Sequence, residues 1–212
     1  MIANKVISKI KVNIAQKNRK RLILPLQRQK LNNKDASIIA STCNGGVLSS
    51  DLGIRFNSPF VNLYILPDDF IRIVSNLKFF MDCELSEVVQ TKYSYPVGTL
   101  NGDVKIYFMH YQSFQEAKKK WDLRKTRVNY DNLYFMMTDR DGCTEEHIRC
   151  FDNLPYKHKI IFTAKPYNYH SVVFCEEFKN MDCVPVLTEW RNIHGERLYD
   201  KYFDFVKWLN DN

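Results

Sequence analysis

The sequence predicts an α/β domain with a mostly parallel sheet and helices on both faces, preceded by a basic helix. Short runs of β-branched and aromatic residues alternate with helical patterns along the chain. Most of these runs are continuously apolar, as in strands buried on both faces. The 212 residues are enough for one sizeable core and too few for two ordinary domains. We therefore expect a single three-layer domain.

The first segment is predicted to be a basic amphipathic arm, residues 1–34, in front of a single α/β domain over residues 35–212. Apolar residues recur at helical spacing over residues 1–24, and Pro25 is expected to end the helix. We favour a stripe that packs onto the domain, since it lacks Trp and Phe. The alternative is a helix that lies on anionic lipid. The stripe consists of Ile2, Val6, Ile10 and Ile14, with Ile7 beside them.

The charge distribution indicates where an anionic partner would bind. The net charge is +7, but ten of the 31 basic residues lie within residues 1–34, which contain no Asp or Glu. The rest of the chain carries 21 basic and 24 acidic residues. A general nucleic-acid binder would spread its basic surface over the folded domain, so we expect no nucleic acid partner. Contact between the arm and the inner face of a membrane fits better.

The start of the chain and the cysteines indicate the compartment. Charges interrupt every apolar stretch near the N-terminus, so no signal peptide is expected. Six cysteines are scattered without the spacing of a disulfide framework. We therefore expect a cytoplasmic protein with reduced thiols, peripheral to the membrane at most.

Beyond the arm, the elements follow in alternation. Strands are predicted over Ser37–Ala40, Val61–Ile65, Lys105–Met109, Leu133–Met137, Lys159–Phe162 and Ser171–Cys175, and more weakly over Val184–Thr188. Helices are predicted over Gly46–Gly53, Asp68–Asp82, Phe114–Asn129, Thr144–Asn153 and Leu198–Leu209. The segment Leu100–Asp103 has the composition of a hairpin turn, so part of the sheet is expected to be antiparallel.

The first candidate site follows the first strand, where Cys43 leads into Asn44, Gly45 and Gly46. Glycines allow the backbone to approach a ligand closely, and the N-terminus of the next helix favours an anion. The same helix end would lower the pKa of Cys43 and make it a nucleophile. The alternative is a structural turn with a buried cysteine.

A second candidate is His110, placed just after a predicted strand, where it would act as general acid or base. A packed histidine among aromatic residues is the alternative. If the fold brings the two strand ends together, Cys43 and His110 would form a Cys–His dyad.

A third candidate is the Asp139-Arg140-Asp141 segment, which follows a hydrophobic strand. Two carboxylates at such a position can hold Mg²⁺ or Mn²⁺ against a diphosphate, so Asp139 and Asp141 are candidate metal ligands and Asp139 a candidate catalytic residue. The alternative is a loop in which Asp141 caps the next turn and Asp139 pairs with Arg140.

Three further basic residues are candidates for phosphate binding. Lys165 lies just beyond a predicted strand, and Arg124 and Arg127 lie on a predicted helix. Arginine binds phosphate through two parallel hydrogen bonds, which favours the two arginines over the lysine run before them.

Several segments, in this order along the chain, resemble a bacterial family of exopolysaccharide biosynthesis proteins that carry domain of unknown function 1919. The resemblance runs from about Leu31 to the helix expected at the C-terminus. Its segments are Ser37–Gly46, Asp51–Gly53, Asn57–Pro59, Tyr95–Gly98, His110–Tyr111, Glu116–Ala117, Lys120–Trp121, Arg124, Arg127, Asn129–Leu133, Asp139–Asp141, Cys143–Glu145, Phe162–Thr163 and Lys165–Tyr167. The resemblance implies a compact α/β domain, with Asn132 and Arg140 among the substrate contacts.

The resemblance also implies a role in surface-polysaccharide assembly. We expect a transferase whose partner is a sugar nucleotide or a lipid-linked glycan. The layout of cysteine, Ser-Pro-Phe and histidine is similar to a second, papain-like bacterial family, which would instead make Cys43 and His110 an acyl transferase or hydrolase pair. A non-catalytic accessory protein of the assembly machinery is the third possibility.

Overall fold

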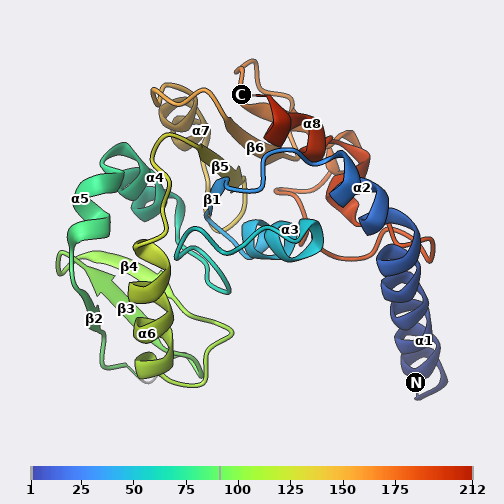
Figure 1. The fold of residues 1–212 in the computed structure, drawn as a ribbon, viewed down its shortest axis with the longest axis horizontal. Coiled ribbons are helices and arrows are strands. Elements are labelled where there is room, and N and C mark those ends of the chain that lie inside the picture. The colour runs from blue at the N-terminus through green and yellow to red at the C-terminus, as the bar shows by residue number, and fades with distance from the viewer. Residues whose placement is uncertain (1, 91, 212) are drawn as a thin grey trace.

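The computed structural model describes residues 2–90 and 92–211, with the side chains of residues 2–7 excepted. The α/β class is confirmed (Figure 1). Four parallel strands form the central sheet in the order β1-β5-β6-β7. They are β1 (Ser37–Ala40), β5 (Leu133–Thr138), β6 (Lys159–Thr163) and β7 (Val172–Phe174).

Alternate residues of the central strands enter two different cores. On β1, Ile38 packs on one face of the sheet and Ile39 on the other. On β5, Tyr134 and Phe135 are divided in the same way, and both are fully buried. This is the burial on both faces that the continuously apolar runs predict, and it makes the three-layer arrangement.

Different helices cover the two faces. One core contains side chains of α3 (Asn44–Leu52) and α8 (Phe205–Asn210). The other core contains side chains of α4 (Pro67–Ser75), α5 (Leu77–Asp82), α6 (Phe114–Lys125) and α7 (Glu145–Asp152). Short 3-10 helices lie at Glu176–Phe178 and Leu198–Lys201.

The antiparallel strands form a sheet of their own instead of joining the parallel one. They are β2 (Leu85–Glu87), β3 (Val97–Leu100) and β4 (Val104–Tyr107). The hairpin predicted at Leu100–Asp103 joins β3 to β4, and Asn101 and Gly102 both adopt positive φ there. This second sheet and α6 lie at the end of the molecule away from the N-terminal helix (Figure 1).

Four predicted elements are wrong in type or extent. Val61–Ile65 forms only an isolated bridge, from Tyr64 to Tyr107, and Val184–Thr188 is not a strand. The helix expected over Asp68–Asp82 breaks at Asn76, and the one expected over Leu198–Leu209 divides into a 3-10 turn and α8. Apolar content predicts that a segment is buried, but it does not determine whether that segment pairs with a neighbouring strand or where a helix breaks.

The helix of the arm is longer than predicted, since Pro25 does not end it. Helix α1 (Ile2–Asn18) passes through a π-helical segment (Arg19–Ile23) into α2 (Leu24–Lys30). Proline in a helix lacks an N–H group and clashes with the carbonyl one turn earlier. The wider π turn, in which Leu24 N–H donates to Arg19 O, admits Pro25 near the start of α2.

The apolar stripe of the arm does not pack onto the domain as we favoured. Ile10 is 51% exposed and Ile14 is 41% exposed. The side chains of Ile2, Val6 and Ile7, which complete the predicted stripe, lie outside the described residues. Ala15 and Arg19 carry the contact instead, on a different side of the helix. Within the described residues, no helix has the length and hydropathy needed to cross a membrane.

Candidate functional site

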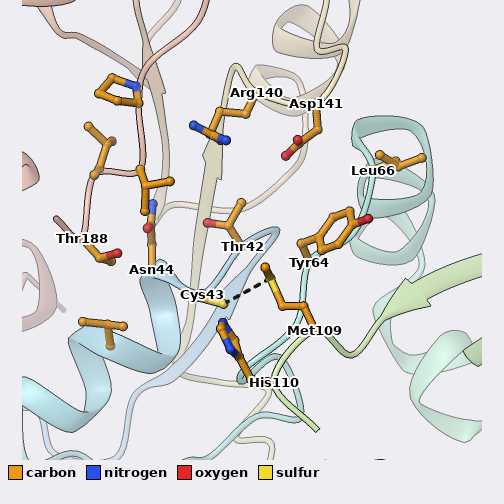
Figure 2. A pocket seen from close by; sticks show the side chains of 14 residues that line it. Thr42, Cys43, Asn44, Tyr64, Leu66, Met109, His110, Arg140, Asp141 and Thr188 are labelled. Carbon is orange, nitrogen blue, oxygen red and sulfur yellow. Dashed lines mark hydrogen bonds between the residues drawn. The ribbon is translucent and has the colours of Figure 1, made fainter. Parts of the chain in front are cut away.

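A cavity of about 610 Å³ opens at the carboxyl ends of the neighbouring parallel strands β1 and β5. Ligands of open α/β sheets bind at this edge. The segment after the antiparallel β4 contributes Met109 and His110, and a loop over residues 185–188 forms the opposite wall (Figure 2). The lining residues are Thr42, Cys43, Asn44, Val47, Tyr64, Leu66, Met109, His110, Arg140, Asp141, Pro185, Val186, Leu187 and Thr188.

Cys43 lies in this cavity, just before the first residue of α3. Its thiol donates to the carbonyl of Leu63 at 3.6 Å and lies 4.0 Å from the Met109 sulfur. Burial raises the pKa of the Cys43 thiol to about 11. Loss of hydration outweighs the lowering by backbone hydrogen bonds at Cys43 and Leu63, so the thiol does not have the lowered pKa that we expected.

His110 lines the same cavity, and Figure 2 shows its ring beside Cys43. The strand β4 ends at Tyr107, so His110 belongs to the turn that follows and is exposed to solvent. The fold thus brings together the two residues of the predicted Cys–His dyad, from segments that are 67 positions apart in the chain. An exposed imidazole in a cavity can exchange protons with a bound substrate.

Asn44 is the first residue of α3 and is only 5% exposed. Its amide lines the cavity, and no side-chain hydrogen bond to it is found among the described residues. The first backbone N–H groups of a helix have no partner within the helix and carry a positive partial charge. The amide and the helix end together offer hydrogen-bond donors to an anion.

Gly45 and Gly46 do not line the cavity, contrary to the prediction that they contact substrate. A Cβ atom on Gly45 would lie 2.8 Å from the Cβ of Ala40 and 3.1 Å from Ile38 Cγ2. A Cβ atom on Gly46 would lie 3.1 Å from Val61 Cγ1. The glycines are required by the close packing of α3 on β1 and on the chain after it.

Arg140 and Asp141 line the opposite side of the cavity from α3 (Figure 2). The guanidinium of Arg140 donates to the carbonyl of Val184 at 3.2 Å, which orients the side chain and leaves other N–H groups for a ligand. Asp141 is exposed and has φ 59°, a conformation that Asp tolerates in tight turns.

Asp139 points away from the cavity, into the interior. Its carboxylate accepts hydrogen bonds from the backbone N–H groups of Ala164 at 2.6 Å and Val184 at 2.8 Å. Burial raises the pKa of Asp139, although these bonds oppose the effect. Both oxygens are engaged, so the predicted Asp139–Asp141 metal pair does not fit a cation. In the part of the chain that the structure describes, no group of three or more His, Cys, Asp or Glu is arranged to hold a metal ion.

The other predicted phosphate-binding residues do not line the cavity, and two of them make contacts within the protein. Arg124 donates to the Tyr111 hydroxyl at 2.8 Å and lies over the Phe56 ring. Lys165 donates to the carbonyl of Lys179 at 2.8 Å. Neither side chain lines the cavity, and neither does Arg127, which lies half-buried beyond the end of α6.

Asn132 lies at the opposite edge of the sheet, directly before β5 begins. Its amide exchanges a pair of 2.9 Å hydrogen bonds with the amide of Asn33. This pair joins the end of the arm to the start of β5. Asn132 therefore lies outside the cavity at the ends of β1 and β5, and its observed contacts are structural.

Several cavity residues were missed from the sequence. Thr42 belongs to the same segment as Cys43, and its place beside that cysteine was a sufficient signal for a cavity residue. Tyr64 and the loop over residues 185–188 could not be identified in this way, because the sequence predicts strands at both segments. Their contribution depends on how distant segments pack around the ends of β1 and β5.

Comparison with known proteins places most of the chain in one family. A family model described as a domain of unknown function, DUF1919, matches residues 14–210. An uncharacterised protein of Haemophilus influenzae is 46% identical over 203 residues, which cover 95% of this chain and 97% of that protein. The family model begins within the arm and covers both sheets and every residue that lines the cavity. The chain therefore belongs to the DUF1919 family.

Proposed function

We propose that the protein is a transferase that acts on a glycosyl diphosphate, either a sugar nucleotide or a lipid-linked sugar, in the synthesis of surface polysaccharide. The polysaccharide setting is suggested by the sequence resemblance described above. The reaction class is suggested by the cavity at the ends of β1 and β5.

The observation that carries the proposal is the convergence of anion-binding groups on one cavity. The N-terminus of α3, the buried amide of Asn44 and the guanidinium of Arg140 all face it. A helix end and an arginine are the groups that proteins use most often for phosphate. The diphosphate would bind between them.

The rest of the lining suits the two ends of such a substrate. Thr42, Asp141 and Thr188 offer hydroxyl and carboxylate groups for the hydroxyls of a sugar. Apolar side chains make up most of the remaining wall, and they would contact a nucleobase or the first isoprene units of a lipid carrier. Among them are Val47, Leu66 and Val186.

His110 is the residue best placed to act as general base. In the proposed reaction an acceptor hydroxyl attacks the anomeric carbon, a new C–O bond forms, and the bond from that carbon to the diphosphate oxygen breaks. His110 takes the proton of the hydroxyl, and the diphosphate leaves with its electron pair. Arg140 and the α3 N-terminus would stabilise the negative charge that develops on the leaving group.

The test is a thermal-shift panel of UDP-, GDP- and CMP-sugars and undecaprenyl-phosphate analogues, with and without Mg²⁺ or Mn²⁺. A ligand at about a hundred times its Kd should stabilise the protein by roughly 2.7 kcal/mol, or several degrees in Tm. Arg140→Ala and Asn44→Ala should abolish the shift. Arg149→Ala, which removes an exposed arginine outside the cavity, should leave it unchanged. A shift that survives Arg140→Ala would contradict the proposed site, and a flat panel would favour the accessory protein.

A second candidate function follows from the position of Cys43 beside His110 (Figure 2). A Cys–His pair could transfer an acyl group to or from a glycan. The histidine would take the thiol proton, the thiolate would attack the acyl carbonyl, and the bond from that carbon to the donor oxygen or sulfur would break as the histidine protonates the leaving group. A hydroxyl of the acceptor, or water, would then displace the thiolate from the thioester. The raised pKa of the Cys43 thiol makes this the weaker candidate. A shift with acetyl-CoA alone, together with loss of activity on alkylation of Cys43, would favour it over the glycosyl transferase.

A further inference from the structure

We propose that the N-terminal arm is a docking surface for an anionic membrane. The face of the arm that carries Ile10 and Ile14 is unpartnered: both side chains are exposed, as are Leu22 and Leu26 on the next turns. Helix α1 projects from the body at the end opposite the antiparallel sheet (Figure 1). The exposed apolar face is therefore free to meet an extended surface.

The contact between arm and body fixes which face points outward. Ala15 and Arg19 are 1% and 2% exposed and lie against the domain. At 100° per residue, Ile10 and Ile14 lie within about 40° of each other and at least about 100° around the helix from those two residues. The apolar face thus points away from the body.

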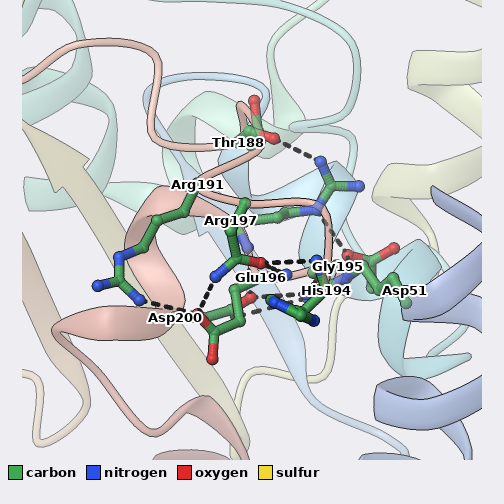
Figure 3. A network of polar contacts seen from close by, with 10 residues as sticks. Asp51, Thr188, Arg191, His194, Gly195, Glu196, Arg197 and Asp200 are labelled. Atoms are coloured by element: carbon green, nitrogen blue, oxygen red, sulfur yellow. Dashed lines mark hydrogen bonds and ion pairs between the residues drawn. The ribbon is translucent and has the colours of Figure 1, made fainter. Parts of the chain in front are cut away.

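The ion pairs of Arg19 hold the arm in this orientation. Its Nε lies 2.8 Å from Asp51 and its Nη1 lies 2.5 Å from Asp200, and Nη1 also donates to the carbonyl of Gly195. Figure 3 shows Asp51, Gly195, Arg197 and Asp200 close together in this network. These contacts fix the arm to the domain, so the face that carries Ile10 and Ile14 stays directed away from the body.

The charge of the arm identifies the occupant as anionic. Residues 1–34 contain ten basic residues and no acidic one. Lys9, Lys17 and Lys20 are exposed on the described part of the arm. In a helix that lies at a membrane interface, apolar side chains enter the acyl boundary while flanking lysines reach the lipid headgroups.

The same charge argues against two other occupants. A second copy of the chain would bring two strongly basic arms together without acidic partners, and like charges repel. Nucleic acid would neutralise the lysines but would leave Ile10 and Ile14 in water. A membrane containing anionic lipid satisfies both the charge and the apolar face. This inference does not depend on what the cavity binds.

The test is sedimentation of the full chain with vesicles of pure phosphatidylcholine and with vesicles that contain about a third phosphatidylglycerol. We expect binding to the second kind only. Since the described arm has no Trp or Phe to anchor it, binding should depend strongly on charge and fall at 0.5 M salt. Absence of binding to the anionic vesicles at 0.1 M salt would overturn the proposal.

Two arm variants and their matched controls separate the apolar and basic contributions. Ile10→Asn with Ile14→Asn should weaken binding roughly tenfold. Leu123→Asn, at an apolar position on α6 that is 54% exposed, should not. Replacing Lys9, Lys17 and Lys20 by Gln should weaken binding roughly fivefold for each charge removed. The same change at Lys105, Lys119 and Lys207, which are exposed elsewhere, should have little effect.

Other outcomes would assign the face to a different occupant and so overturn the proposal. Sedimentation velocity that shows a dimer abolished by the Ile→Asn pair would mean that a second copy covers the face. A chain that does not bind vesicles but binds duplex DNA would mean that the arm binds nucleic acid. In that case the Ile→Asn pair would keep DNA binding and the lysine variant would lose it. Circular dichroism and Tm of each variant check that it is folded.

Discussion

At the scale of single residues, neighbours in the sequence have opposite roles. Asp139 and Asp141 are two positions apart, yet Asp139 holds the backbone of two other segments while Asp141 lines the cavity. Arg140 between them contacts both the cavity and the loop at Val184. Strand β5 ends at Thr138 and the chain turns at Asp141, where φ is 59°, so the alternation of a strand no longer applies and the two carboxylates lie on different sides.

Removing the Asp139 carboxylate should destabilise the fold. In Asp139→Ala the N–H groups of Ala164 and Val184 lose their acceptor in a buried place, at about 1–3 kcal/mol for each. Urea unfolding measures the loss. Asp141→Asn, which keeps a residue that tolerates positive φ, is the control and should stay within about 0.5 kcal/mol of the parent. Equal stability of the two variants would show that Asp139 does not hold these segments.

The pKa of Cys43 can be tested by alkylation. With a pKa near 11 against an ordinary 9.0, the thiolate fraction at pH 7 is about a hundredfold below that of an ordinary thiol, because the charged form lacks hydration. The rate of iodoacetamide labelling, followed by mass spectrometry, should rise about tenfold per pH unit and continue to rise beyond pH 9. The reference is Cys43 in the urea-unfolded chain. Faster labelling in the folded protein at pH 7 would support an activated nucleophile instead.

At the scale of elements, helix α3 determines the shape of the site. Its first turn supplies Asn44 and free N–H groups, and its glycines allow it to lie close to β1. The helix ends at Gly53, whose φ of 72° is a left-handed cap. The sequence suggested that Gly45 and Gly46 form a ligand-binding loop. In the structure they allow α3 to pack closely, and this packing sets the position of the helix N-terminus at the cavity.

Adding a methyl group at Gly45 tests this interpretation. The new Cβ of Gly45→Ala would meet the Cβ of Ala40 at 2.8 Å, so α3 must move away from β1, at about 1–3 kcal/mol. Urea unfolding of Gly45→Ala is compared with that of Ser50→Ala, on the exposed side of the same helix, which should be near neutral. Unchanged stability of Gly45→Ala with altered ligand affinity would argue for direct substrate contact.

At the scale of the whole molecule, one buried network joins the arm, α3 and the C-terminal segment. Asp51 on α3 lies 2.8 Å from Arg19 and 2.9 Å from Arg197. Arg197 in turn donates to the carbonyl of Thr188, a residue of the cavity wall, as Figure 3 shows. Burial alone would lower the pKa of Arg19, but Asp200 and Asp51 raise it, so its charge is kept. The orientation of the arm and the far wall of the cavity depend on the same ion pairs.

Removing Arg19 should cost more stability than a surface arginine does. Arg19→Ala removes one of the two arginine partners of Asp51 and the arginine partner of Asp200 in a largely buried place, which costs about 3–5 kcal/mol. Arg21→Ala, an exposed change two residues away, should be within about 0.5 kcal/mol of the parent. Urea unfolding and limited proteolysis of the arm measure both. Similar results for the two variants would show that the arm is not held by this network.

The sequence by itself determined the α/β class, the segments that form the central strands, the hairpin and the basic arm, because burial on both faces and helical periodicity are local patterns. It also indicated the edge of the sheet where the cavity lies, through Cys43 and His110. Only the tertiary structure decided which side chains face the cavity, that Asp139 and Asn132 are structural, and that Ile10 and Ile14 remain exposed. These outcomes depend on contacts between segments far apart in the chain, and no local pattern specifies how such segments pack.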